Sequence, residues 1–315
     1  MGEPMNNYIN YYYNLYPVNI HYRAPYFYFM VNNKKYYLVF YERPLPEIKP
    51  LYELSLFLLK QSIAIHQIIL NKDRQPLTFI NNKPYVLLKI NGDETRKVTL
   101  DDINYLHLIK FDAFVDPLLM RTDWGKLWSK KIDYLEYQFH HIANKFPLVA
   151  DCLSYFIGLG ENAIAYVNNT KHEVLLSFPE RFTISHKRIN IDDTCLELYN
   201  PLNFILDYQV RDIAAYIKMA FFAELNLWAQ IKAYFTVNQF SPYSLRLLYA
   251  RLLYPSYFFD QYELVITGQD DPESLNRIIT KMPAYEKFLQ HFYYYLNHNN
   301  NMPPIEWLHK SFNQP

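Results

Sequence analysis

The side chains best suited to chemistry gather between residues 186 and 212. His186 could act as a general base or as a metal ligand. The carboxylates of Asp192, Asp193 and Glu197 could together hold a cation. Each group also has a structural role, which we favour: a buried, hydrogen-bonded histidine that braces a loop, and an Asp-Asp pair that caps a turn or a helix.

The elements that would position these side chains are indicated by hydrophobic spacing. Residues 26–41 predict two strands joined at Asn32 and Asn33, because asparagine tolerates the left-handed conformation of a tight hairpin. Residues 51–69 carry leucines and isoleucines at helical spacing, which predicts a helix. Residues 77–92 repeat the pattern of strand, Asn-Asn turn and strand, and end at a glycine. We expect a lobe boundary after that glycine, Gly92.

The chain beyond Gly92 has mostly helical spacing. The helices expected first are 101–114, 126–144 and 146–169, with a helix start after Gly160 inside the last of these. Short apolar runs between residues 173 and 203 predict brief strands and loops, after which helical spacing resumes to about residue 296. We expect the terminal segment 303–312 to pack back through Trp307.

This element order is that of kinase-like folds, in which a nucleotide lies between two lobes. Residues 185–218 resemble the catalytic region of aminoglycoside phosphotransferases and choline kinases. That pattern consists of His-x-Asp, an Asn five residues after the Asp, a metal-binding Asp on the next strand, and a later Asp that opens a helix. The resemblance implies an α+β, two-lobed, protein-kinase-like fold, with a small β-rich N-lobe (1–92) and a larger helical C-lobe (93–315).

The scaffold positions of the pattern are present, but its chemical positions are replaced. His186 matches the histidine, and Asp212 matches the structural aspartate before the helix. The catalytic Asp position holds Arg188, the Asn position falls on Asp193, and the next-strand Asp falls on Asn200. Phosphoryl transfer needs a carboxylate to orient the attacking hydroxyl and oxygen ligands for Mg²⁺. Arg188 cannot do the carboxylate's work.

The N-terminal half departs from the pattern as well. Residues 36–40 resemble the strand that carries the phosphate-pairing lysine, and that position is Val39. Lys34 and Lys35 are expected in the preceding turn. The first hairpin contains no glycine, so the glycine-rich cover over the phosphates is missing. We therefore expect no ATP turnover and no bound metal or cofactor.

Five longer segments carry a more specific resemblance. They are 126–136, 156–167, 184–189, 200–218 and 251–263. In these segments the chain resembles the spore-coat kinase-like proteins of Bacillus and its relatives, the CotS group and particularly its YutH branch. The resemblance implies association with the endospore coat, with other coat proteins as partners, in the mother-cell cytoplasm and spore coat of a Bacillus-like endospore former.

Composition excludes several other classes of protein. Lys+Arg and Asp+Glu both number 31, whereas a protein that grips phosphate backbones needs a basic surplus, so no nucleic-acid partner is expected. No segment approaches the roughly 18 to 20 uninterrupted apolar residues of a membrane span. Cys152 and Cys195 form no CxxC pair and are expected to be ordinary thiols in a reducing compartment.

These observations favour a non-catalytic, pseudokinase-like coat protein that acts through protein interactions in coat assembly. The alternative is an atypical kinase that uses ATP and Mg²⁺ on a small molecule or a protein, with Asp192, Asp193 or Asp207 replacing the lost carboxylates. A small-molecule sensor without turnover is a third hypothesis. Two of those carboxylates converging near a Lys or Arg in an open cleft would favour the kinase.

Overall fold

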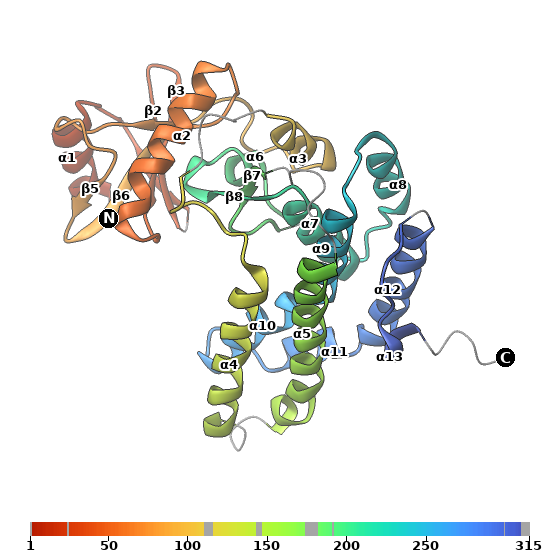
Figure 1. Ribbon diagram of the computed structural model, residues 1–315. Helices are drawn as coiled ribbons and strands as arrows, with labels where there is room; N and C mark the ends of the chain where they lie inside the picture. Colours follow the sequence, from red (N-terminus) through yellow and green to blue (C-terminus); the bar gives the residue numbers. More distant parts are fainter. Residues whose placement is uncertain are drawn as a thin grey trace. The chain divides into compact units, whose positions relative to one another are not determined.

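The chain forms two compact units, each built from two separate stretches of sequence (Figure 1). The computed structural model describes residues 2–23, 25–109, 116–142, 147–173, 182–190, 192–298 and 300–309. The first unit comprises Met1–Met120 and Ile184–Leu206, and the second comprises Arg121–Thr183 and Asp207–Pro315. The boundary predicted after Gly92 therefore lies inside the first unit.

The first unit contains one antiparallel sheet, in the order β1-β2-β3-β6-β4, with β5 also paired to β6. Its strands are β1 (Ile20–Arg23), β2 (Tyr26–Val31), β3 (Lys34–Phe40), β4 (Gln67–Ile69), β5 (Thr78–Ile80) and β6 (Lys83–Lys89). Asn32 and Asn33 have φ of 49° and 58°, and Asn81 and Asn82 have φ of 50° and 62°. Left-handed residues at both central positions give turns whose twist suits a hairpin. Both predicted hairpins are confirmed.

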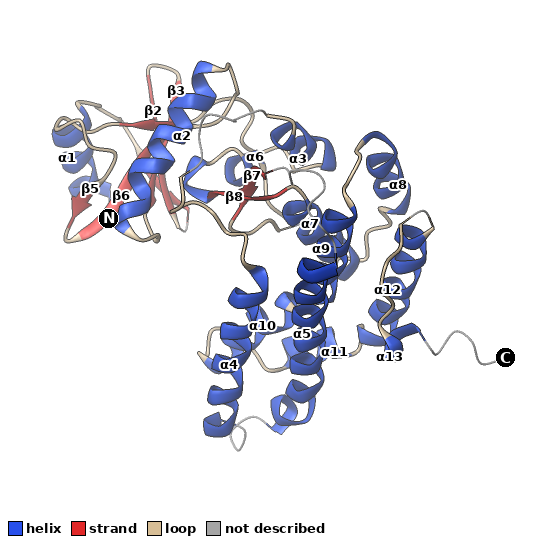
Figure 2. Ribbon diagram, in the orientation of Figure 1, coloured by secondary structure: helices blue, strands red, loops and turns tan. Residues whose placement is uncertain are grey.

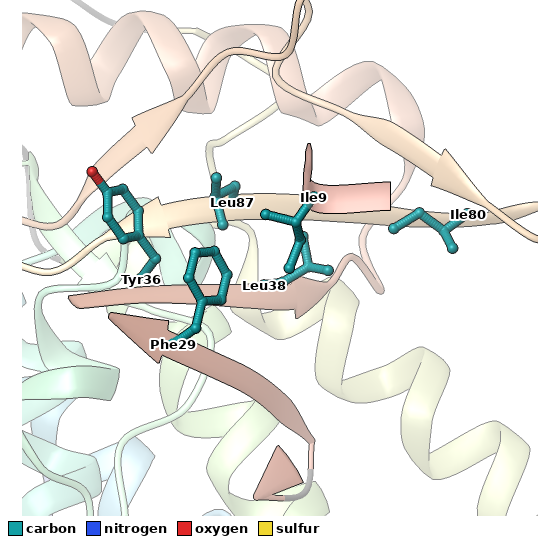
Figure 3. Close-up of a cluster of buried hydrophobic side chains, with 6 residues drawn as sticks. All are labelled: Ile9, Phe29, Tyr36, Leu38, Ile80 and Leu87. Carbon is teal, nitrogen blue, oxygen red and sulfur yellow. The ribbon is translucent and has the colours of Figure 1, made fainter. Parts of the chain in front are cut away.

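One face of the sheet is covered by α1 (Gly2–Tyr13), a helix that the sequence analysis did not predict. The buried cluster beneath it consists of Ile9, Phe29, Tyr36, Leu38, Ile80 and Leu87 (Figure 3). Phe29 lies opposite Tyr36, and Leu38 lies opposite Leu87. Because directly opposed residues point to the same face of a sheet, this register gives α1 a continuous apolar surface to bury.

The helix predicted after the first hairpin is shorter than its apolar spacing suggests. This helix, α2 (Ile48–Lys60), is followed by a turn at Ser62, whose φ is 62°. Ile65 and Ile69, which were predicted to extend the helical face, lie beyond that turn, and Ile69 belongs to β4. A left-handed residue ends a helix, and the β-branched isoleucines that follow favour a strand.

The stretch from residue 184 to residue 206 adds short elements to the first unit. These are the end of β7 (Phe182–His186), α6 (Cys195–Leu198), η3 (Pro201–Asn203) and the start of β8 (Phe204–Tyr208). The stretch 1–120 of the same unit also contains η1 (Leu45–Glu47), α2 (Ile48–Lys60) and α3 (Leu100–His107). β7 and β8 pair in a second, two-stranded sheet. The brief strands expected here are thus confirmed in two cases, whereas residues 195–198 form a helical turn. The run at 174–178 lies outside the described residues.

Long-range bonds explain why this stretch belongs to the first unit. The Cys195 amide donates to the Arg96 carbonyl at 2.8 Å. The guanidinium of Arg43, itself buried, donates to the carbonyls of Leu202 (2.9 Å) and Phe204 (2.6 Å). These bonds satisfy backbone groups of both stretches, so the first sheet and residues 184–206 form one unit.

In the described residues of the second unit, loops connect helices, and the strand residues are the ends of β7 and β8 (Figure 2). Its helices are α4 (Trp124–Ile142), α5 (Pro147–Glu173), α7 (Val210–Phe222), α8 (Trp228–Val237), α9 (Pro242–Leu253), α10 (Ser256–Ile266), α11 (Glu273–Ile279), α12 (Met282–Asn297) and α13 (Glu306–His309). α5 packs against α4 and α9, and α7 packs against α9. None of the described helices is long and apolar enough to cross a membrane.

Helix α5 runs without a break through Gly158 and Gly160, which corrects the predicted helix start after Gly160. A Cβ atom at Gly160 would lie 2.7 Å from Ile132 Cδ1 of α4 and 3.6 Å from Tyr254 Cε2. The glycine is therefore explained by the close approach of α4 and not by a helix boundary.

The C-terminal segment packs back onto the second unit, but not through Trp307. Trp307 is 42% exposed, whereas its neighbour Leu308 is 1% exposed. The Tyr166 hydroxyl donates to the Pro303 carbonyl (3.0 Å), and Arg246 Nη2 donates to the Asn301 carbonyl (2.9 Å). A four-residue helix can bury only one side, and here that side carries Leu308.

Candidate functional site

His186, at the end of β7, is a buried structural residue. It is 1% exposed, and its Nε2 atom lies 2.7 Å from the Leu198 carbonyl oxygen. Its ring meets that of Phe204 edge to face, with centroids 5.4 Å apart. This arrangement fits the brace that we favoured over a base or metal ligand, since it fixes the loop between β7 and α6.

The acidic residues of the loop after His186 each have a partner of their own. Arg188, at the catalytic Asp position, is exposed. Asp193 Oδ2 accepts from the Asn190 amide at 2.7 Å, and burial raises the pKa of this carboxyl. The carboxylate of Asp192 is exposed and pairs with Lys97 Nζ at 3.1 Å. Asp193 thus closes a turn and Asp192 makes a surface ion pair.

Glu197 caps helix α6. Its Oε2 atom accepts from the Thr194 amide (2.9 Å) and hydroxyl (2.8 Å), which completes a capping box. In the parts of the chain that the structure describes, no three His, Cys, Asp or Glu side chains are grouped in a way that could hold a metal ion. The three carboxylates considered for a cation therefore each have another partner.

Asn200 does not lie on a strand, as its assignment to the next-strand Asp position required. It begins η3, where its side-chain oxygen accepts from the Leu202 amide at 3.0 Å. The strand that follows is β8, and its acidic residue is Asp207. The structure thus places a carboxylate on the strand where the phosphotransferase pattern has its metal-binding aspartate.

The carboxylate of Asp207, in the second unit, is fully buried and surrounded by donors. Trp124 Nε1 lies 3.0 Å from both carboxylate oxygens, and the Tyr208 amide lies 2.7 Å from Oδ1. Arg251 Nη2 donates to Oδ2 at 2.8 Å, and Arg211 Nη1 donates to it at 3.1 Å. Five donor contacts therefore occupy the two oxygens that a metal ion would need.

The indole of Trp124 also lies against both guanidinium groups. Arg251 Cζ is 4.0 Å from a ring centroid of Trp124, and Arg211 Cζ is 4.5 Å from it. Burial lowers the pKa of Arg251 to about 10, so the group remains a cation at neutral pH. The two guanidinium groups thus compete directly with any divalent cation for the carboxylate of Asp207.

Asp212, the other scaffold residue of the pattern, is 1% exposed and lies in the first turn of α7. A buried carboxylate there is favourably placed, since the amino end of a helix carries partial positive charge. His186 and Asp212 are thus both buried within elements of the fold, as the scaffold assignments expected.

Strand β3 of the first unit corresponds to the strand that carries the phosphate-pairing lysine in the phosphotransferase pattern. Val39 is 8% exposed and lies opposite Val86 of β6, so this position is part of an apolar contact. The two lysines expected in the turn instead begin β3, and Lys35 is hydrogen bonded to Glu94. A valine supplies no charge for a phosphate, and the nearest lysine of the strand already has an acidic partner.

Comparison with known proteins decides the family. The family model described as "Spore coat putative kinase YutH" matches residues 6–292. The chain belongs to the YutH spore-coat family. Within it, the chain is 26% identical over 296 residues to the endospore coat-associated protein YutH of Bacillus subtilis, covering 84% of this chain and 86% of that one.

Solved structures similar to this YutH-family chain have the predicted kinase-like fold. An aminoglycoside phosphotransferase from Alicyclobacillus acidocaldarius superposes with a TM-score of 0.55 at 10% identity, covering 90% of this chain and 93% of that one. Spectinomycin phosphotransferase superposes with a TM-score of 0.56 at 9% identity, covering 100% and 99%. The α+β, aminoglycoside phosphotransferase-like fold is confirmed, and at such low identity the likeness concerns the fold alone.

The partners of Asp207 were missed by the sequence analysis. Arg251 opens one of the segments that carry the YutH-family resemblance, and Arg211 lies inside another. Trp124 lies two residues before a third segment. The only signal for Trp124 and Arg251 was therefore the resemblance itself, since nothing in local spacing shows that these two distant residues meet the carboxylate that Arg211 also contacts.

Proposed function

We propose that this YutH-family chain is a non-catalytic coat-associated protein that acts through contacts with other proteins of the spore coat. The observation that carries the proposal is the state of Asp207. Its oxygens are already bonded to Trp124, Arg211 and Arg251, and it is fully buried. In the phosphotransferase pattern, the carboxylate on this strand binds the metal ion that phosphoryl transfer uses. Here that carboxylate pairs with guanidinium groups instead, so the chain keeps the kinase-like fold but lacks this metal ligand.

Two further replacements support this proposal. Arg188 places a cation where the phosphotransferase pattern has the carboxylate that orients the attacking hydroxyl. Val39 places a buried apolar side chain where the pattern has the phosphate-pairing lysine. Because these two residues and Asp207 serve different steps, restoring any one of them would not restore the chemistry. The proposed function needs no cofactor.

The alternative, an atypical kinase, would require ATP, Mg²⁺ and carboxylates that can be released from their present partners. Asp193 would have to leave its turn with Asn190, and Asp207 would have to leave two buried guanidinium groups. Asp192 is exposed and could move freely. The B. subtilis relative is described as coat-associated, which supports action in the coat under either hypothesis.

ATP turnover separates the two hypotheses. Purified full-length chain is incubated with ATP and Mg²⁺ or Mn²⁺, and phosphate release is compared with that of Asp207→Asn and Asp192→Asn. We expect no release above the level of either variant. Metal-dependent release by the natural chain that disappears in one of the two variants, while circular dichroism shows that variant to be folded, would establish the kinase instead. A thermal-shift titration with ATP and Mg²⁺ tests binding without turnover, since a ligand of the native state raises the midpoint.

Location and partners need a separate experiment in an endospore former. We propose that the chain is made in the mother-cell cytoplasm and is then incorporated into the coat. A tagged chain should be recovered in the coat extract of mature spores, and photo-crosslinking before extraction should join it to coat proteins. Recovery only from the spore core or the forespore cytoplasm would contradict this proposal.

A further inference from the structure

The second unit contains a pocket of about 470 Å³ where α7, the loop after it, α8 and α12 meet. The described residues that line it are Ile217, Ala220, Phe221, Leu225, Asn226, Leu227, Trp228, Ile231, Phe288 and His291. None of these is Lys, Arg, Asp or Glu. Ile217, Ala220 and Ile231 are 2%, 2% and 4% exposed, so the pocket has a well-buried aliphatic base.

Aromatic rings form part of the pocket wall. The rings of Phe221 and Phe288 are 5.2 Å apart and tilted by 39°. Trp228 is held edge to face against Phe292, with centroids 5.9 Å apart. Such contacts fix ring orientation, so the rings present rigid flat surfaces at little cost in side-chain entropy.

The loop at the pocket mouth is held in a strained conformation. Glu224 has φ of 59°, which is unfavourable for a residue with a side chain. Lys281 Nζ lies 2.7 Å from a Glu224 carboxylate oxygen and donates to the Phe222 carbonyl at 2.8 Å. This arrangement leaves Leu225, which lines the pocket, 48% exposed. The Leu225 amide donates to the Ala220 carbonyl at 2.9 Å, so the left-handed residue ends α7 and leads the chain into the pocket mouth.

We propose that this pocket binds a small, planar, apolar molecule that carries a single hydrogen-bonding group. Its volume lies within the roughly 300 to 1,000 Å³ of typical small-molecule sites and exceeds what one aromatic side chain of a partner protein would fill. The uncharged walls select an apolar body, and the side-chain amide of Asn226 provides the hydrogen bond. The proposal concerns a site distinct from the Asp207 cluster and does not depend on whether the chain is catalytic.

The test uses N-phenyl-1-naphthylamine, a neutral flat dye with one N–H group that fluoresces in apolar surroundings. Full-length chain is titrated with the dye while emission and the unfolding midpoint are followed. We expect saturable binding at one dye per chain and a midpoint that rises with dye concentration. Emission that increases in proportion to added dye, without saturation, would overturn the proposal.

Matched variants locate the binding. Ala220→Trp fills the base of the pocket and should weaken binding at least tenfold. Ala233→Trp introduces the same side chain at an exposed position of α8 outside the lining and should leave binding unchanged. Circular dichroism checks that each variant is folded. If Ala220→Trp fails to fold, Leu225→Asp at the exposed mouth replaces it as the test of the site. This variant should also weaken dye binding. Unchanged affinity in a folded pocket variant would refute the site.

Discussion

Arg251 Nη2 of α9 lies 2.8 Å from Asp207 Oδ2, at the end of β8, with both side chains buried. A buried ion pair contributes little stability relative to an apolar pair of similar size, but removing one partner leaves an uncompensated charge. The pair therefore has two consequences. It makes Asp207 structurally necessary, and it denies the carboxylate to a metal ion.

Asp207→Asn should lower the free energy of unfolding by about 3 to 5 kcal/mol, because the buried guanidinium of Arg251 and the partly buried one of Arg211 lose their counter-charge. Chemical denaturation followed by circular dichroism measures the change. Asp192→Asn is the matched control. Asp192 is exposed, so the same substitution should change stability by less than about 0.5 kcal/mol. Equal effects of the two substitutions would show that the Asp207 cluster is not under structural constraint.

Substituting the residues of the phosphotransferase pattern back into the chain should not create a kinase. The double variant Val39→Lys and Arg188→Asp restores a cation and a carboxylate, but Asp207 keeps its three side-chain partners. We expect Mg²⁺-dependent ATP hydrolysis to stay at background. Hydrolysis that appears in the double variant, but not in Val39→Lys with Arg188→Ala, would contradict the proposal that the bonded state of Asp207 prevents turnover.

Lys218 should make stability rise with pH above neutrality. It is 4% exposed, donates to the Tyr254 carbonyl at 2.7 Å, and its pKa is lowered by burial to about 7. In the unfolded chain the group titrates near its ordinary value of 10.5. Between pH 7 and 10.5 the unfolded state therefore binds more protons, and the free energy of unfolding increases with pH, by at most about 1.4 kcal/mol per unit.

The measurement compares the natural chain with Lys218→Met by denaturation at pH 7, 8 and 9. Tyrosines and other groups contribute equally to both chains, so the difference isolates Lys218. The natural chain should gain stability relative to the variant as pH rises. A constant difference across this range would show that the lysine is not desolvated.

The C-terminal segment offers a contrast between neighbouring residues. Leu308→Ala should cost about 2 to 5 kcal/mol, since the leucine is 1% exposed and its loss leaves a cavity. Trp307→Ala, although it removes a larger side chain, should cost clearly less because Trp307 is 42% exposed. Thermal unfolding ranks the two. A larger loss of stability in Trp307→Ala than in Leu308→Ala would show that Trp307 anchors the C-terminal segment, as the sequence analysis predicted.

Features with local causes could be predicted from the sequence. The two Asn-Asn turns were found because left-handed conformations in tight hairpins depend on the turn residues themselves. The end of α2 was missed because Ile65 and Ile69 continue a helical spacing by chance, and only the backbone at Ser62 shows where the helix stops. Gly160 was misassigned for a related reason, since the side chain that approaches it, Ile132, belongs to another helix.

The candidate site shows the same division. His186 could be assigned from its place in a short pattern, and its hydrogen bond to Leu198 suits the role given to it. The position of the next-strand aspartate could not be fixed, because loop length between Arg188 and Asp212 does not determine where a strand begins. The guanidinium and indole partners of Asp207 come from three different helices. Such a convergence depends on tertiary structure, which single-residue spacing does not encode.

The bonds from Arg43 to the carbonyls of Leu202 and Phe204 have a consequence for synthesis on the ribosome. The first sheet is translated early, but the backbone that completes its unit emerges more than a hundred residues later. At about 5 to 20 residues per second, roughly 8 to 30 seconds pass between synthesis of Arg43 and synthesis of its acceptors. Nascent chains stalled before residue 184 should therefore be more sensitive to protease in the first 120 residues than chains stalled after the second unit has emerged.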